Sequence, residues 1–375
     1  MDFQWSLQPM LKWMRCIGIY LESPGSVIGS PFRIWIIAFG LVVFFVNLCR
    51  NAIFIGEYFP KLDNSSSEMS TPVLWNTVIS MSNYLFVTTG SQLSLIVGSI
   101  SRWPGLIQIL RQMEKEHFFE AKHYRRFRRT CISALAFLIT VLVVIAIVVT
   151  LIILPIDMPI VTKVSELLYP TLVLYVFSGA AMFSCVGWIT SDMFMILAEK
   201  VMQQLNKSCK FNRTDWSRRL DSWRHQHYTM LQLVDKINNC YSGLLLVLIA
   251  SSFVMMINTS FLIMRRDLNL NILLHLSVLI IEFGHFAMLI YVPHRIRESA
   301  SHLFYQDAPM SRSRQSNTPR KGIFKLNFFI VDALDSLPKI TALGLFDVNL
   351  HLAPSIVGTT LTYLIILCQF QYSKN

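Results

Sequence analysis

The feature of this chain that most constrains its fold is the run from Cys131 to Leu154, in which 24 consecutive residues carry no charged side chain. A helix needs about 20 apolar residues to cross the hydrocarbon core of a bilayer, so this run is typical of a transmembrane helix. The composition agrees, because only 15% of the residues are charged, against about 25% in a soluble domain. We therefore predict an all-α integral membrane protein.

Seven segments of the chain are long and apolar enough to be transmembrane helices. The fifth and sixth are separated by only a few residues, which predicts a tight hairpin. The seventh has Pro354 near its start, where the first turn of a helix tolerates proline. The predicted spans are residues 32–54, 71–100, 131–154, 167–196, 240–264, 270–292 and 350–370.

The distribution of lysine and arginine predicts the orientation of these spans. Of the 33 basic residues, 24 lie in the connections after the second, fourth and sixth spans, while the other three connections hold only Lys61, Lys163, Arg265 and Arg266. Basic connections stay on the cytoplasmic side. We therefore expect a cytoplasmic N-terminus and, after seven crossings, an extracellular C-terminus. The sequon at Asn64 then lies outside, where a glycan can be attached.

The same pattern separates the classes of function. The net charge of +11 is compatible with a nucleic-acid partner, but residues 118–130 place bases and aromatics at the inner end of a span, where they face anionic lipid headgroups. A G-protein-coupled receptor has its N-terminus outside the cell, which the charge distribution disfavours. Because seven spans fit that class, it remains the alternative function. A transporter would be expected to show internal repeats or broken helices around midplane charges, and the sequence shows neither. No nucleophile–base set or metal-ligand spacing is evident, so we expect no enzyme, no cofactor and no metal; the pair His225 and His227 lacks further ligands.

Polar side chains inside the predicted spans indicate helix contacts or a cavity. Ten lie between Asn76 and Ser94, and such groups should face other helices or water rather than lipid. Glu282 lies near the middle of its span, three residues before His285 and so on the same helix face. The two residues predict either a structural hydrogen-bonded pair or part of a pocket.

The last span carries a stripe on one face. Its members are spaced by 4, 3, 4 and 3 residues, which is a helical period. The stripe predicts a pore-lining helix or a small-residue packing face, and the spacing alone does not choose between them. One helix cannot enclose a pore, so the first interpretation requires an oligomer with this helix at its axis. The members are Ser355, Thr359, Thr362, Ile366 and Gln369.

The end of this span resembles the signature of the insect gustatory receptor family. Thr362 and Tyr363 are followed by five mostly apolar residues and then by Gln369 and Phe370. The residues just before the span, 344–349, resemble the family's lead-in to its last helix. The chain length, the seven spans and the cytoplasmic N-terminus agree with the family's architecture.

This resemblance implies a ligand-gated, non-selective cation channel of sensory-neuron plasma membranes, related to insect odorant receptors. It implies a homo- or heterotetramer in which the seventh helix lines a central pore. Residues 1–31 would be a cytoplasmic segment, 32–322 a six-helix bundle with the ligand pocket, and 323–375 an anchor plus the pore helix. The implied partners are a small-molecule tastant or contact cue, membrane lipids, permeant cations and other receptor subunits, without nucleic acid. The implied pore and gate residues are Ser355, Thr359, Thr362, Ile366, Gln369 and Phe370, with Gln369 and Phe370 at the gate.

The other helices would enclose a ligand pocket open to the outside. Leu364 stands where the sugar-receptor branch carries Glu, so a typical sugar receptor is disfavoured and bitter compounds, contact pheromones or other nutrients are favoured. Depth along the spans and side-chain chemistry select the candidate pocket residues Trp75, Tyr84, Tyr175, Phe177, Asn258, His275 and Glu282.

Overall fold

The computed structural model describes residues 2–19, 71–116, 118–153, 169–207, 213–265, 270–305 and 320–372, with short stretches between 34 and 56. A π-helical turn, Gly98–Arg102, joins α3 to α4, and a two-stranded antiparallel hairpin precedes α12. The helices are α1 (Phe3–Cys16), α3 (Thr71–Val97), α4 (Trp103–Lys115), α5 (Ala121–Ile153), α7 (Tyr169–Lys207), α8 (Arg213–Arg265), α9 (Leu270–Tyr305), α11 (Arg320–Asp335) and α12 (Leu352–Tyr372), and the strands are β1 (Thr341–Ala342) and β2 (Phe346–Asp347).

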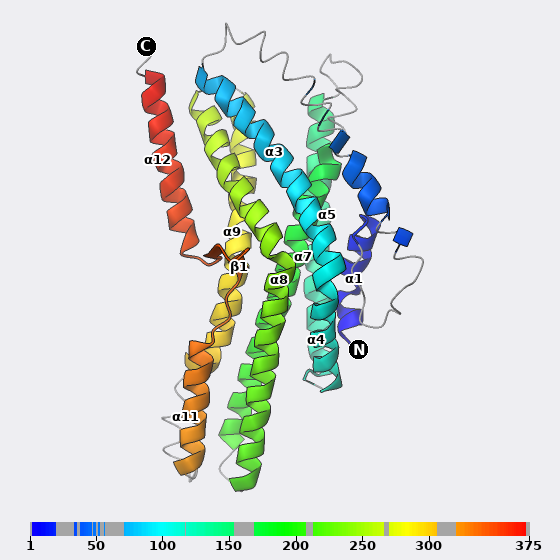
Figure 1. Ribbon diagram of the computed structural model, residues 1–375, viewed down its shortest axis with the longest axis vertical. Helices are drawn as coiled ribbons and strands as arrows, with labels where there is room; N and C mark the ends of the chain where they lie inside the picture. The colour runs from blue at the N-terminus through cyan, green and yellow to red at the C-terminus, as the bar shows by residue number, and fades with distance from the viewer. Residues whose placement is uncertain are drawn as a thin grey trace.

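Six of the seven predicted spans coincide with helices, namely α3, α5, α7, α8, α9 and α12. Successive long helices run in alternate directions, as spans that cross a membrane in turn must (Figure 1). Within the described residues, four helices are long and apolar enough to cross a bilayer, and 352–366 forms a shorter apolar helix. In the predicted first span, 32–54, the described stretches are helical and the residues between them lie outside the described residues, as does Asn64.

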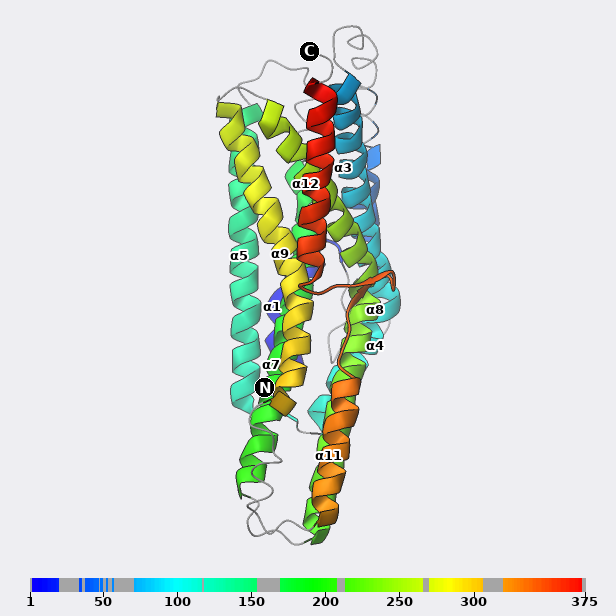
Figure 2. The same cartoon turned by 90° about the vertical axis from the view of Figure 1, so that its left-hand side faces the viewer.

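Two helices are far longer than a membrane crossing requires. At 1.5 Å per residue, the 39 residues of α7 and the 53 of α8 extend about 58 and 80 Å, against a hydrocarbon core of about 30 Å. Both helices therefore extend well beyond the hydrocarbon core. The extensions project at the end opposite to the C-terminus of α12, where α11 lies beside α8 (Figure 2).

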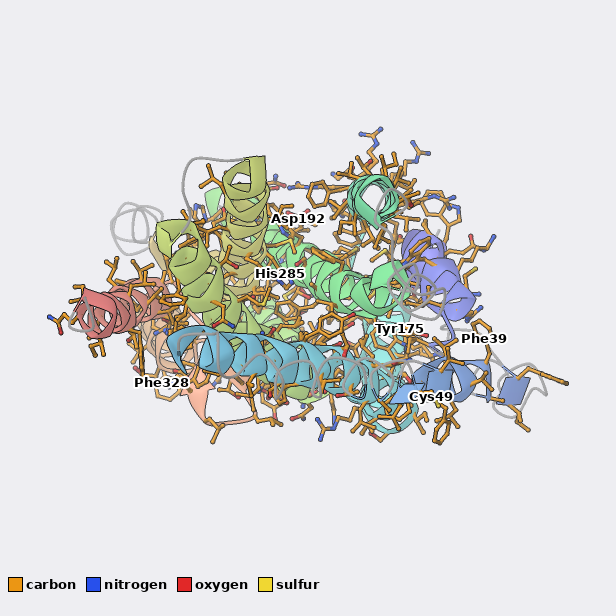
Figure 3. All side chains as sticks on the ribbon, turned by 90° about the horizontal axis from the view of Figure 1, so that it is seen from above. Phe39, Cys49, Tyr175, Asp192, His285 and Phe328 are labelled. Atoms are coloured by element: carbon orange, nitrogen blue, oxygen red, sulfur yellow. The ribbon has the colours of Figure 1, made fainter. Side chains whose placement is uncertain are left out.

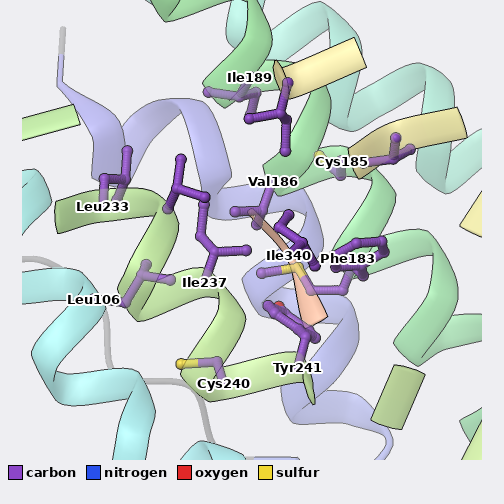
Figure 4. Close-up of a cluster of buried hydrophobic side chains, with 14 of the residues drawn as sticks. Leu106, Phe183, Cys185, Val186, Ile189, Leu233, Ile237, Cys240, Tyr241 and Ile340 are labelled. Carbon is purple, nitrogen blue, oxygen red and sulfur yellow. The ribbon is translucent and has the colours of Figure 1, made fainter. Parts of the chain in front are cut away.

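The core is centred on α7. In the most apolar 18-residue stretch within residues 174–204, 89% of α7 is buried, whereas the corresponding value for α5 is 11%. Phe183, Val186 and Ile189 of α7 pack with Ile237 and Tyr241 of α8 (Figure 4). By contrast, α5 turns large apolar side chains outward, as a helix whose solvent is lipid does.

The N-terminal helix α1 belongs to this core. Phe3, Met10 and Met14 are at most 1% exposed, and the Tyr175 hydroxyl of α7 donates a hydrogen bond of 2.6 Å to the Ile17 carbonyl. Trp13 Nε1 donates to Ser178 Oγ at 3.0 Å. Residues 1–31 therefore include a helix that is fixed to α5 and α7.

The hairpin before α12 is the one addition to the all-α prediction among the described residues. Leu343 and Gly344 adopt positive φ angles of 50° and 75° in its turn. Asn238 of α8 forms two hydrogen bonds with Thr341. The Thr341 N–H donates to Asn238 Oδ1 at 2.9 Å, and Asn238 Nδ2 donates to Thr341 Oγ1 at 3.2 Å. The hairpin therefore ties the start of α12 to α8.

Candidate functional site: a cavity in the helix bundle

A cavity lies between α3, α7, α8 and α9. Its free volume is about 80 Å³, enough for several water molecules. Each helix contributes to its wall, and the lining residues are Asn83, Tyr84, Val87, Thr88, Val176, Phe177, Leu248, Ser251, Ser252, Met255, Glu282 and His285.

The cavity lies near the middle of the predicted membrane. Asn83 and Glu282 are each twelve residues from the starts of α3 and α9, and Ser251 is fourteen residues before the end of α8. At 1.5 Å per residue these positions lie about 18–21 Å from that end of the bundle. Three helices therefore bring polar side chains to the same depth.

One wall of the cavity is polar. Asn83 Nδ2 donates to Ser251 Oγ at 3.2 Å and to the Ser251 carbonyl at 3.3 Å, which joins α3 to α8. Ser252 Oγ donates to Glu282 Oε2 at 3.4 Å, which joins α8 to α9. A half-buried carboxyl group with one long hydrogen bond retains capacity for a further partner.

Another part of the wall is aromatic and includes a polar atom that lacks a partner among the described residues. The rings of His285 and Phe177 lie 5.4 Å apart and tilted by 43°. His285 is 7% exposed, and its Nε2 has no hydrogen-bond partner among the described residues. Because an unmade hydrogen bond of a buried group costs free energy, a ligand that bonds to Nε2 would gain from it.

The candidate pocket residues from the sequence divide into three groups. Tyr84, Phe177 and Glu282 line the cavity. Tyr175 points to α1, where it bonds to Ile17, and Figure 3 shows it well apart from His285. Asn258 is buried on α8 but is not part of the lining.

The other two candidates, Trp75 and His275, lie on α3 and α9, but their side chains are outside the described residues. Several lining residues were not among the candidates predicted from the sequence. Ser251 and Ser252 were detectable, because an adjacent pair of hydroxyls interrupts an otherwise apolar span.

The predicted stripe on α12 is exposed in the single chain. Ser355, Thr359, Thr362, Ile366 and Gln369 are all exposed, and the Phe370 side chain lies outside the described residues. The three hydroxyls donate to carbonyls four residues earlier, at 3.4, 2.8 and 2.9 Å. Each hydroxyl proton is thereby used within the helix, and the oxygen lone pairs are available to the outside.

The histidine pair is divided between two structural roles. His225 Nε2 lies 2.9 Å from Glu116 Oε2, whereas His227 packs edge-on against Phe194 and Phe329. Within the described residues no group of three or more His, Cys, Asp or Glu side chains is placed to hold a metal ion.

Comparison with known proteins identifies the relatives. The family described as 7tm chemosensory receptor matches residues 7–374. The chain is similar to the solved structure of the insect olfactory receptor OR5 from Machilis hrabei, with 16% identity, a TM-score of 0.70, and coverage of 98% of this chain and 100% of that one. The same receptor in complex with eugenol matches with 15% identity, a TM-score of 0.71 and the same coverage. No curated protein matches the chain.

At such identities the likeness to OR5 shows the fold, which is that of an insect chemosensory receptor. The family resemblance seen at Thr362–Phe370 is confirmed over nearly the whole chain.

Proposed function

Because the chain belongs to the 7tm chemosensory receptor family, we propose that it is a gustatory receptor of the sensory-neuron plasma membrane, a non-selective cation channel opened by a small molecule. The observation that carries the proposal is the buried His285 Nε2, which lacks a hydrogen-bond partner among the described residues and lines the cavity with Glu282. A ligand that combines an apolar body with a hydrogen-bonding group would fill the cavity and bond to His285 Nε2. OR5 of Machilis hrabei has been solved in complex with eugenol.

The proposed assembly is a homo- or heterotetramer, with the N-terminus cytoplasmic and the C-terminus outside. The exposed stripe of α12 would then line the central pore, where hydroxyl oxygens with free lone pairs suit a hydrated cation. Gln369 and Phe370 would form the gate at the outer end. Each subunit would contribute one such helix.

A ligand opens the channel only if it binds the open arrangement more tightly than the closed one. The free volume of about 80 Å³ is small, so a larger ligand must move the walls apart. The α8 and α9 helices supply Ser251, Ser252, Glu282 and His285 to the cavity and are also the helices that contact α12. Separation of the cavity walls would therefore be transmitted to α12 directly and through the hairpin held by Asn238.

The test is whole-cell recording from cells that express the full chain, with a panel of bitter compounds, sugars and eugenol. His285→Phe keeps a ring but removes the nitrogen, so we expect the half-maximal concentration of a hydrogen-bonding agonist to rise about tenfold, equivalent to ~1.4 kcal/mol. His294→Phe, on the same helix but outside the cavity lining, is the matched control.

Two results would overturn the proposal. If the currents vanish when GDP-β-S in the pipette blocks G-protein signalling, the chain is a G-protein-coupled receptor. If both histidine variants respond like the wild type to every agonist, the ligand binds elsewhere.

A further inference from the structure

A second, larger cavity opens between α5, α7 and α9. Its free volume is about 470 Å³, within the range of about 300–1,000 Å³ that is typical of ligand sites. One end is basic and polar, with Arg126, Arg129 and Thr130, and the other is apolar, with Phe137 and Val141. We call this cavity the α5 groove.

The α5 groove follows the depth of one membrane leaflet. Arg126 and Arg129 precede the uncharged run that starts at Cys131, so they lie at its membrane boundary. From Arg126 to Val141 the helix rises about 22 Å, which carries the groove from headgroup level into the hydrocarbon core. With the orientation proposed above, this is the cytoplasmic leaflet, which carries the anionic lipids.

The basic end has an excess of positive charge. Arg126 bonds to Asp192 at 2.9 Å, but its side chain is 59% exposed and its other donors remain available. Arg295 also approaches Asp192, at 3.6 Å. Arg129 is exposed and makes no ion pair with any described residue. Two arginines thus share the carboxylate of Asp192, and Arg129 has no ion pair among the described residues, which leaves two positive charges to be balanced.

A polar atom without a partner lies deeper in the α5 groove. Ser184 of α7 is 5% exposed, and its Oγ has no hydrogen-bond partner among the described residues. The neighbouring Cys185 Sγ lies 3.2 Å from Cys131 Sγ of α5, which places Ser184 between the levels of Arg129 and Phe137. The ester groups of a phospholipid come at this level, between phosphate and chains. A hydroxyl there can donate to an ester carbonyl.

We propose that the α5 groove binds one anionic phospholipid of the cytoplasmic leaflet. Arg126 and Arg129 hold the headgroup phosphate, Ser184 bonds to an ester carbonyl, and an acyl chain lies against Phe137 and Phe177. Charge favours this occupant, since arginine recognises phosphate through several donors at once and the apolar end excludes a free anion. Phe177 also lines the ligand cavity, so the acyl chain contacts the wall between the two cavities.

The experiment measures lipid binding to the purified full-length receptor by native mass spectrometry. The probes are phosphatidylserine and phosphatidylcholine at equal concentration, and the readout is their ratio on the protein. Arg129→Gln removes one positive charge from the basic end without disturbing the Arg126–Asp192 pair. Because phosphatidylserine is anionic and phosphatidylcholine is zwitterionic, we expect the preference for phosphatidylserine to fall about fivefold. Arg125→Gln is the matched control, because Arg125 is exposed on the same helix but does not line the α5 groove.

A second pair of variants tests the apolar end. Ala134→Phe fills the α5 groove and should displace the bound lipid, whereas Ala136→Phe, on the exposed side of the same helix, should not. Equal effects of Arg129→Gln and Arg125→Gln would show a diffuse basic girdle and overturn the proposal. So would displacement of the lipid by millimolar inorganic phosphate, which would show a simple anion site. Because the readout is binding, it is independent of whether the protein conducts ions.

Discussion

Gly187 of α7 lies in close contact with α9, and its replacement gives a sharp test of the packing. A Cβ atom at Gly187 would come within 2.2 Å of Val292 Cγ1 and 3.5 Å of Ile296 Cδ1. Carbon atoms prefer separations of about 3.5–4.0 Å, so the shortfall is more than 1 Å. Val292 is 1% exposed and β-branched, so its side chain has little freedom to move away.

We therefore expect Gly187→Ala to destabilise the receptor by about 1–3 kcal/mol, the usual cost of overpacking. For a large chain this corresponds to a fall in Tm of about 2–4 °C per kcal/mol. The measurement is thermal unfolding of the purified receptor, followed by tryptophan fluorescence. Gly284→Ala is the matched control, since that glycine lies in α9 with nothing within 4 Å of its Cβ position. In a helix such a change is expected to be neutral or stabilising by about 0.5–1 kcal/mol.

A second substitution separates this clash from other causes. Val292→Ala removes the methyl group that Gly187→Ala would meet, so the double variant should be more stable than the sum of the two single effects predicts. If Gly187→Ala unfolds at the same temperature as Gly284→Ala, or if Val292→Ala gives no rescue, the close contact of α7 with α9 is wrong.

Three further predictions concern the pore, the ion cluster and the helical extension. Phe370→Ala should raise the basal current in the absence of ligand, and unchanged resting and evoked currents would exclude Phe370 as the gate. Asp192→Asn leaves Arg126 and Arg295 without a counter-charge, but both are partly exposed, so we expect a loss of only about 1–3 kcal/mol by thermal unfolding, with partial recovery on adding Arg295→Met. His227 lies in the extension of α8 outside the predicted membrane span, and burial lowers its pKa to about 4. Its unfolded pKa is near 6.5, so stability should fall as the pH drops from 6.5 towards 4, and His227→Phe should remove that part of the pH dependence in Tm measured at pH 7.5, 6 and 5.

Hydropathy and charge predict the helices well, because crossing a bilayer imposes a length and a composition on each segment. They predict the side of a helix poorly. Depth arithmetic placed Tyr175 and Phe177 at similar heights, but residues two apart on a helix are turned by about 200° from one another. Only Phe177 faces the cavity, and Tyr175 faces α1. Helix rotation depends on packing, which one sequence does not reveal.

The sequence pattern of α1 already indicates that one face of this helix is buried. Phe3, Leu7, Met10, Leu11 and Met14 recur at helical spacing and are all buried. The pattern predicts an amphipathic helix, but not its partners, because the apolar face of such a helix fits lipid as well as protein. Contacts with α5 and α7, more than a hundred residues away, had to be seen in the structure.

Exposure has opposite meanings on two helices of this protein, and side-chain chemistry distinguishes them. The outward face of α5 is apolar, with Phe137 66% and Ile147 53% exposed, so its solvent is lipid. The outward face of α12 carries Ser355, Thr359 and Thr362, whose oxygens would be poorly solvated in hydrocarbon. The polar stripe of α12 therefore suits water or another protein surface at membrane depth better than lipid. The central pore proposed above, shared by several copies, would supply both.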